Sequence, residues 1–69
     1  SDEDAWKGAQ HYNIACYHAL AGDKDAALEK LKTAFPLRAD LVPWAQQDTD
    51  LESLWEDAEF QSLLKANEE

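Results

Sequence analysis

Apolar residues recur at three- and four-residue steps along most of this chain, which is the spacing of amphipathic helices. The stretch from residue 1 to 21 is predicted to be one helix, capped by Ser1 or Asp2. Gly8 weakens this helix without breaking it. Two overlapping rows form its broad apolar face: Tyr12, Ala15, Cys16, Ala19 and Leu20.

A tight turn is predicted at Gly22-Asp23. Glycine adopts the left-handed conformation without steric cost, so Gly22 can end the first helix with a positive φ. Asp23 is a candidate N-cap for a second helix over residues 24–35, which Pro36 is predicted to end. The two helices form an antiparallel hairpin. The apolar stripe of the second helix consists of Ala27, Leu28, Leu31, Ala34 and Phe35. Leu31 and Phe35 are predicted to lie in the core.

Two shorter helices are predicted to follow. The third covers residues 40–47, because Pro43 is tolerated in a first helical turn. Residues 48–50 form a turn and cap, residues 51–55 a single turn or short helix, and Asp57 caps a last helix over residues 58–67. The inward residues of these two helices are predicted to be Leu41, Trp44, Ala45, Phe60, Leu63 and Leu64.

The hairpin resembles a tetratricopeptide repeat, a helix-turn-helix unit of about 34 residues. The family's turn falls on Gly22-Asp23, and its spaced apolar pattern falls on Ile14, Ala15, Ala27, Leu31 and Ala34. The segment DTDLESLWEDAEFQSLL, residues 48–64, is similar to the tail that closes many bacterial arrays of this family.

The chain also departs from the family pattern. His11 stands where the family often has Trp, Ala15 where it prefers Gly, and His18 where it prefers Tyr. The prolines lie at positions 36 and 43 rather than near Ala39.

The resemblance implies an all-α domain over residues 1–69, with a repeat hairpin at about 8–36 and closing helices at about 37–67. It also implies a groove that binds a protein or peptide segment. The groove residues would be Ala9, Tyr12, Asn13, Cys16, Leu20 and Gln47. Asn13 matches the Asn of the family's carboxylate clamp, but this helix offers only Lys7 as a basic partner. The alternative for Asn13 is a hydrogen bond to the backbone of a neighbouring helix.

Two functions stay open at this point. One is an interaction or scaffold module that binds a protein or peptide. The other is a structural C-terminal cap of a longer repeat array, with no ligand of its own. Coverage of Tyr12, Cys16 and Leu20 by the chain's own third helix would favour the cap, and their exposure would favour binding. Trp6 packs under the last helix or faces a neighbouring repeat.

The net charge of −9 over 69 residues argues against binding to nucleic acid or to an anionic membrane, since both require basic contacts. It is compatible with a basic peptide partner, or with the solvated surface of a protein from a salt-adapted, halophilic organism. A single cysteine suits a cytoplasmic protein without disulfides, and we expect a monomer without a signal peptide or membrane span.

Neither a metal nor another cofactor is expected. His11 and His18 are two helical turns apart, about 10.5 Å, and Cys16 lies off their face. The sequence has no Cys-x-x-Cys or His-x-x-x-His pair. It has no Gly-rich phosphate loop and no nucleophile placed beside a base, so we expect a protein that is not an enzyme.

Overall fold

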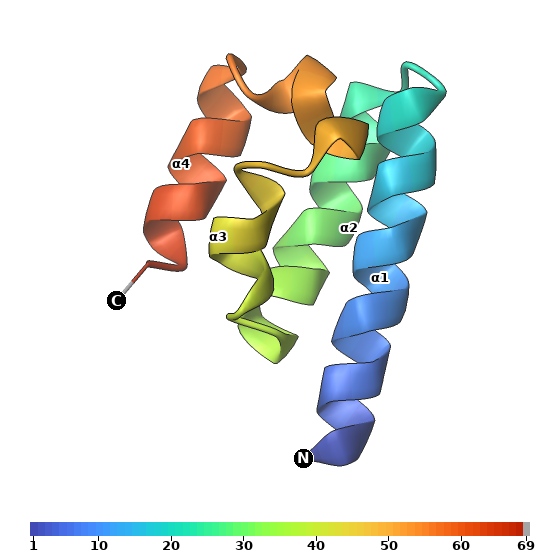
Figure 1. Cartoon of the computed structure of the whole chain (residues 1–69), viewed down its shortest axis with the longest axis vertical. Helices are drawn as coiled ribbons and strands as arrows, with labels where there is room; N and C mark the ends of the chain where they lie inside the picture. The colour runs from blue at the N-terminus through green and yellow to red at the C-terminus, as the bar shows by residue number, and fades with distance from the viewer. Residues whose placement is uncertain (69) are drawn as a thin grey trace.

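The computed structural model describes residues 1–68 and contains five helices and no strand within that part of the chain. Its radius of gyration of 10.8 Å is close to the value of about 11 Å for a compact chain of this length. Figure 1 shows α1 and α4 on opposite sides, with α2 and α3 between them. The helices are α1 (Asp2–Leu20), α2 (Lys24–Leu37), α3 (Leu41–Ala45), the 3₁₀ helix η1 (Thr49–Leu54) and α4 (Ala58–Ala66).

The predicted turn between α1 and α2 is confirmed. Gly22 has a φ of 83°, the left-handed region that favours glycine. The backbone N–H of Asp23 donates to the carbonyl of His18 at 2.9 Å, and that of Gly22 donates to the carbonyl of Ala19. These two bonds satisfy the last carbonyls of α1 in the pattern of a Schellman motif. The Asp23 side chain then caps α2, as predicted, by accepting from the N–H of Ala26.

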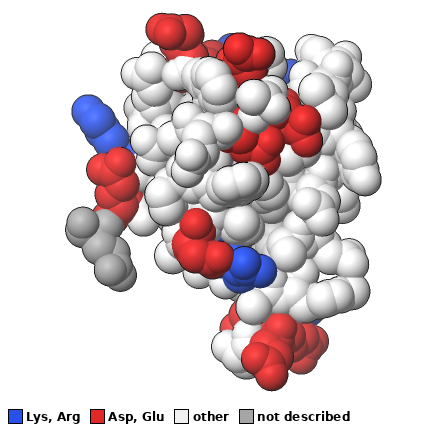
Figure 2. Space-filling model, viewed as in Figure 1, with Lys and Arg blue, Asp and Glu red and all other residues white. Residues whose placement is uncertain are grey.

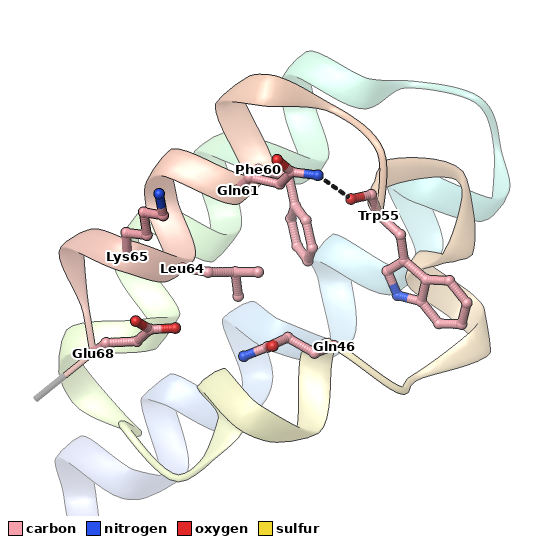
Figure 3. Close-up of a pocket in the computed structure, with 7 residues that line it drawn as sticks. All are labelled: Gln46, Trp55, Phe60, Gln61, Leu64, Lys65 and Glu68. Atoms are coloured by element: carbon pink, nitrogen blue, oxygen red, sulfur yellow. Dashed lines mark hydrogen bonds between the residues drawn. The ribbon is translucent and has the colours of Figure 1, made fainter.

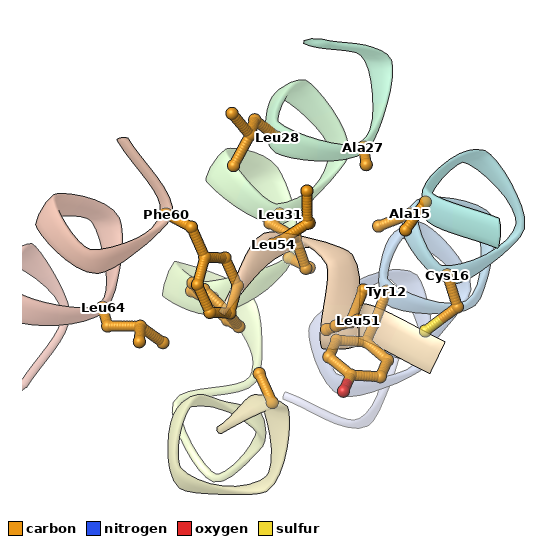
Figure 4. Packing of buried hydrophobic residues seen from close by; sticks show 14 of the residues in the cluster. Tyr12, Ala15, Cys16, Ala27, Leu28, Leu31, Leu51, Leu54, Phe60 and Leu64 are labelled. Carbon is orange, nitrogen blue, oxygen red and sulfur yellow. The ribbon is translucent and has the colours of Figure 1, made fainter. Parts of the chain in front are cut away.

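Small residues let α1 and α2 lie close together, and larger ones fill the space beside them. Leu31 and Phe35 are fully buried, as predicted. Figure 4 shows Phe60 of α4 pointing towards Leu31 and Leu54 within this core. The buried cluster consists of Tyr12, Ala15, Cys16, Ala19, Ala27, Leu28, Leu31, Ala34, Phe35, Val42, Ala45, Leu51, Leu54, Phe60 and Leu64.

The end predicted for α2 is wrong by two residues, because Pro36 lies inside the helix. Pro36 is exposed and lacks only one N–H, so the helix loses a single bond in its last turn. The N–H of Arg38 donates to the carbonyl of Ala34 at 2.9 Å and closes the helix beyond the proline. Packing of Phe35 next to Pro36 offsets the local cost of the proline.

The third helix is shorter than predicted, and its inward face is rotated. Val42 and Ala45 are buried, Leu41 is half-buried, and Trp44 faces solvent. A helix of five residues buries only one narrow row, and Val42 and Ala45, three residues apart, form that row. The prediction that Trp44 is inward is therefore wrong.

Trp6 is also exposed, so it does not pack under the last helix. It belongs to α1, and α4 lies on the opposite side of the molecule (Figure 1). The alternative, that Trp6 faces a neighbouring repeat, stays a prediction.

The closing segment begins with η1, a short helix where a single turn or short helix was predicted, and ends with α4. Asp48 caps η1, and Asp57 caps α4 by accepting from the N–H of Phe60 at 3.0 Å. Phe60 and Leu64 are buried as predicted, and Leu63 is partly buried against the core.

Gly8 is buried where α1 passes close to the end of α2. A methyl group added there would lie 2.6 Å from Cγ of Arg38 and 3.0 Å from Cβ of Leu37. The Arg38 guanidinium crosses α1 at this point and donates to the carbonyl of Ala5 at 3.4 Å. Glycine therefore permits the close approach of the two helices, which compensates for its low helix propensity.

We expect Gly8→Ala to destabilise the protein by about 1 kcal/mol. Overpacking typically costs about 1–3 kcal/mol, which exceeds the helix-propensity gain of about 1 kcal/mol. Urea denaturation measures the change, and Gln10→Ala on the exposed face of α1 is the control. The double variant Gly8→Ala, Arg38→Ala should recover part of the loss. A Gly8→Ala protein more stable than the parent would contradict the close approach.

Asp57 also joins α4 to the start of α2, because Lys24 Nζ donates to its Oδ1 at 3.0 Å. The pKa of Asp57 lies below its usual value, first because of this bond and then because of the Phe60 N–H. A carboxyl with a lowered folded-state pKa stabilises the fold above its unfolded pKa of about 4. It loses that contribution as the pH falls through the folded value.

We therefore expect Asp57→Asn to lower the melting temperature at pH 7, although Asn still caps the helix. The difference from the parent should shrink towards zero when the pH is lowered from 7 to below the folded-state pKa of Asp57, because both side chains are then uncharged. Glu29→Gln on the exposed face of α2 controls for the removal of one negative charge. A difference that is the same at both pH values would show that the ion pair contributes nothing.

Candidate functional site

Two of the predicted groove residues, Tyr12 and Cys16, are buried by the chain itself. The Tyr12 hydroxyl donates to Oδ2 of Asp48 at 2.7 Å, and the Cys16 thiol lies 3.9 Å from the same oxygen. The other oxygen of Asp48 accepts from the N–H of Asp50 and caps η1. The element that covers Tyr12 and Cys16 is thus η1 with its cap, and not the third helix, whose coverage of them was one of the two outcomes left open by the sequence.

The surroundings of Tyr12 and Cys16 keep both side chains uncharged. Burial is the main cause that raises the pKa of Tyr12, and the hydrogen bond and charge of Asp48 add to it. Burial, followed by the charges of Asp48 and Asp50, raises the pKa of the Cys16 thiol to about 12. Because the thiolate is the reactive form of cysteine, Cys16 is a poor nucleophile in the folded protein.

The possible metal ligands are arranged differently from the set considered in the sequence. Among the described residues, ligand atoms of Cys16, Asp48 and Asp50 lie within 4.8 Å of one another, and neither histidine belongs to the group. A cation here would have to displace a thiol proton whose pKa is strongly raised, since metals bind the thiolate. We interpret the group as a hydrogen-bonded link between α1 and η1.

The other predicted groove residues do not form one surface with Tyr12 and Cys16. Ala9 is half-buried, whereas Asn13, Leu20 and Gln47 are exposed. Leu20 was grouped with Tyr12 and Cys16 on the apolar face of α1, but unlike them it is exposed. Asn13 is not hydrogen-bonded to a neighbouring helix within the described residues.

A separate groove of about 350 Å³ lies between α3 and α4 (Figure 3). Trp55 lies at one end, with its Nε1 donating to the carbonyl of Ala45, and Gln61 donates to the Trp55 carbonyl at 3.0 Å. Sequence reasoning missed this groove, because its depth depends on how far α4 stands from α3. Its lining residues are Gln46, Trp55, Phe60, Gln61, Leu64, Lys65 and Glu68.

The largest exposed apolar side chains of α1 share one face of the helix. Trp6, Tyr17 and Leu20 are 62%, 71% and 64% exposed. Together with the exposed residues Gln10 and Asn13 they recur at alternating four- and three-residue steps, which places all five on one line along the helix. We call these five residues the α1 stripe. Ile14, 37% exposed, borders it.

Apolar side chains therefore occupy two faces of α1. The second face is the one that α2 and η1 leave uncovered. An exposed row of large apolar residues on a small protein typically marks an interaction site. A helix that is apolar on more than one face usually has neighbours on more than one face.

Comparison with protein-family models, with curated proteins and with solved structures finds no match to this chain. Within the described residues, no helix combines the length and the apolar character needed to cross a bilayer.

Proposed function

We propose that the chain is a non-catalytic protein-interaction module of the tetratricopeptide-repeat type that contacts its partner through the α1 stripe. The observation that carries this proposal is the exposure of Trp6, Tyr17 and Leu20 on one face of α1. The resemblance of the hairpin and tail to the repeat family supports the assignment of type.

The proposed contact surface differs from the groove that the resemblance implied. Tyr12 and Cys16 are engaged with Asp48 of the same chain, so they are not free to bind a peptide. Asn13 and Leu20 belong both to the implied groove and to the α1 stripe. Of the six groove residues, these two are the ones that we retain as contact residues.

The second candidate is a structural cap of a longer helical array. It is favoured by η1, which covers the face of α1 that would otherwise continue the groove. Under this alternative the α1 stripe would pack against helices of the same polypeptide, and no separate partner would exist.

Photocrosslinking in the cells that make the protein separates these functions. A benzophenone amino acid at position 17 should give a discrete adduct with another protein, and this adduct should be lost when Trp6→Ser is added. The same amino acid at position 62, exposed on α4, is the matched control. Adducts confined to the protein's own polypeptide would favour the cap. The absence of adducts at position 17, or the same adducts at both positions, would overturn the proposed interaction surface.

A further inference from the structure

The α1 stripe has the shape of one half of a helix–helix interface. Its positions, 6, 10, 13, 17 and 20, follow the steps by which one helix meets another along a shallow crossing angle. The fourteen steps from residue 6 to residue 20, at 1.5 Å per residue, give it a length of about 21 Å, or about four turns of a helix. The element that best complements such a surface is another helix with an apolar seam.

The charges around the α1 stripe indicate what should flank that seam. Residues 8–22 contain no Asp, Glu, Lys or Arg, although the chain carries a net charge of −9. Asp2, Glu3 and Asp4 are exposed at one end of the stripe. In Figure 2 the right-hand side of the molecule, over α1, is almost entirely white, and a red group lies at its lower end where the chain starts.

Acidic side chains also border the other end. The exposed Asp23 and Asp25 follow Leu20 after the turn. The exposed Asp50 lies beside the stripe, with a carboxylate oxygen within 4.8 Å of Cys16 Sγ. The two cations that flank residues 8–22 in the sequence are paired within the chain, Lys7 with Glu3 at 3.3 Å and Lys24 with Asp57. Lys7 offsets one of the three acids near it, and residues 2–7 keep a net charge of −2. The surface is therefore an uncharged apolar strip with acidic ends.

We infer that the α1 stripe binds an amphipathic helix of another protein whose apolar seam is flanked by Lys or Arg at both ends. This inference rests on the proposed function and adds the chemistry of the partner. Complementary charges at the rim guide association and set the register of the two helices.

A second copy of the chain fits this surface less well. Two α1 helices in parallel would bring two Asp2–Asp4 clusters together. In the antiparallel arrangement each cluster would face the turn and the acidic residues after it in the other copy, where Lys24 is already paired. Neither arrangement supplies the positive charge that the ends of the stripe lack, and like charges across an interface oppose association.

Two designed peptides of 21 residues test the inference. Both carry Leu at the seam positions and Ala and Gln elsewhere; one has three Lys at each end and the other three Glu. We expect the Lys peptide to bind at least about tenfold more tightly in a fluorescence anisotropy titration, and to bind more weakly at 1 M salt than at 0.1 M. Equal affinities of the two peptides would show that the partner helix does not need Lys or Arg at its ends. The proposed function is tested separately, by the crosslinking experiment.

Variants then distinguish the stripe from general attraction to an acidic protein. Trp6→Ser and Tyr17→Ser should each weaken the Lys peptide about tenfold, whereas Trp44→Ser, which removes a 52% exposed Trp from α3, should have no effect. One triple variant replaces the acids at residues 2–4 with their amides: Asp2→Asn, Glu3→Gln and Asp4→Asn. A control variant changes the charge equally, away from the stripe, by replacing Glu56, Glu59 and Glu68 with Gln. The first variant should weaken binding of the Lys peptide more than the control does.

Three further results would overturn the inference. One is equal loss in Trp44→Ser and Trp6→Ser, which would indicate adsorption without a defined site. Another is the absence of binding by either peptide. The third is dimerisation of the protein alone in analytical ultracentrifugation that Tyr17→Ser abolishes, which would make a second copy the occupant of the stripe.

Discussion

Leu31→Ala is expected to remove most of the stability of this protein. Leu31 is fully buried in the middle of α2, and a buried Leu→Ala change costs about 2–5 kcal/mol. The core of a chain this small supplies only about 3–5 kcal/mol in total. The variant should therefore be largely unfolded at 25 °C, with the loss seen in the far-ultraviolet circular dichroism and in the urea midpoint.

Lys32→Ala, next to Leu31 but exposed, is the control and should change stability by less than about 0.5 kcal/mol. A loss below about 1 kcal/mol in Leu31→Ala would mean that α2 does not face the core in the register described above.

Phe60→Ala is expected to destabilise the protein about as much as Leu31→Ala does, but with α4 unfolding first. Deleting a buried Phe side chain costs about 3–5 kcal/mol. Phe60 and Leu64 are the buried side chains that α4 contributes, and Lys24 with Asp57 adds one exposed ion pair. We expect the amide protons of α4 to exchange rapidly in the variant, with α1 and α2 losing protection later.

Native-state hydrogen exchange, followed residue by residue by NMR, measures this difference. Ser62→Ala, on the exposed side of α4, should leave the pattern unchanged. If all helices lost protection simultaneously, α4 would unfold only together with α1 and α2. This result would contradict the prediction that α4 opens on its own.

The hairpin was predictable because each local signal agrees with the packing. Gly22 supplies a positive φ, Asp23 supplies a cap, and the apolar spacing of α2 has one solution that buries Leu31 and Phe35. The cap at Asp57 was predictable for the same reason. These features depend on residues within a few positions of one another.

The candidate site was harder to predict, because α1 is apolar on two faces. Periodicity alone does not say which face is buried, so Leu20 was grouped with Tyr12 and Cys16 although it belongs to the exposed α1 stripe. The partner of Tyr12 is Asp48, 36 residues away, and no local pattern connects them. The face that α3 buries was missed because five residues carry too little periodicity to fix a register.

The burial of Cys16 under η1 makes the reactivity of its thiol a measure of local opening in the protein. The chain has one cysteine, and its thiol has a pKa of about 12 while Asp48 and η1 cover it. An unperturbed cysteine has a pKa of about 8.5, so the folded protein holds far less of the reactive thiolate near pH 8 than the unfolded chain does. Alkylation of the native protein should therefore report how often η1 lifts away from α1, and it should accelerate in Asp48→Ala. A rate equal to that of the unfolded chain would show that η1 does not protect the thiol.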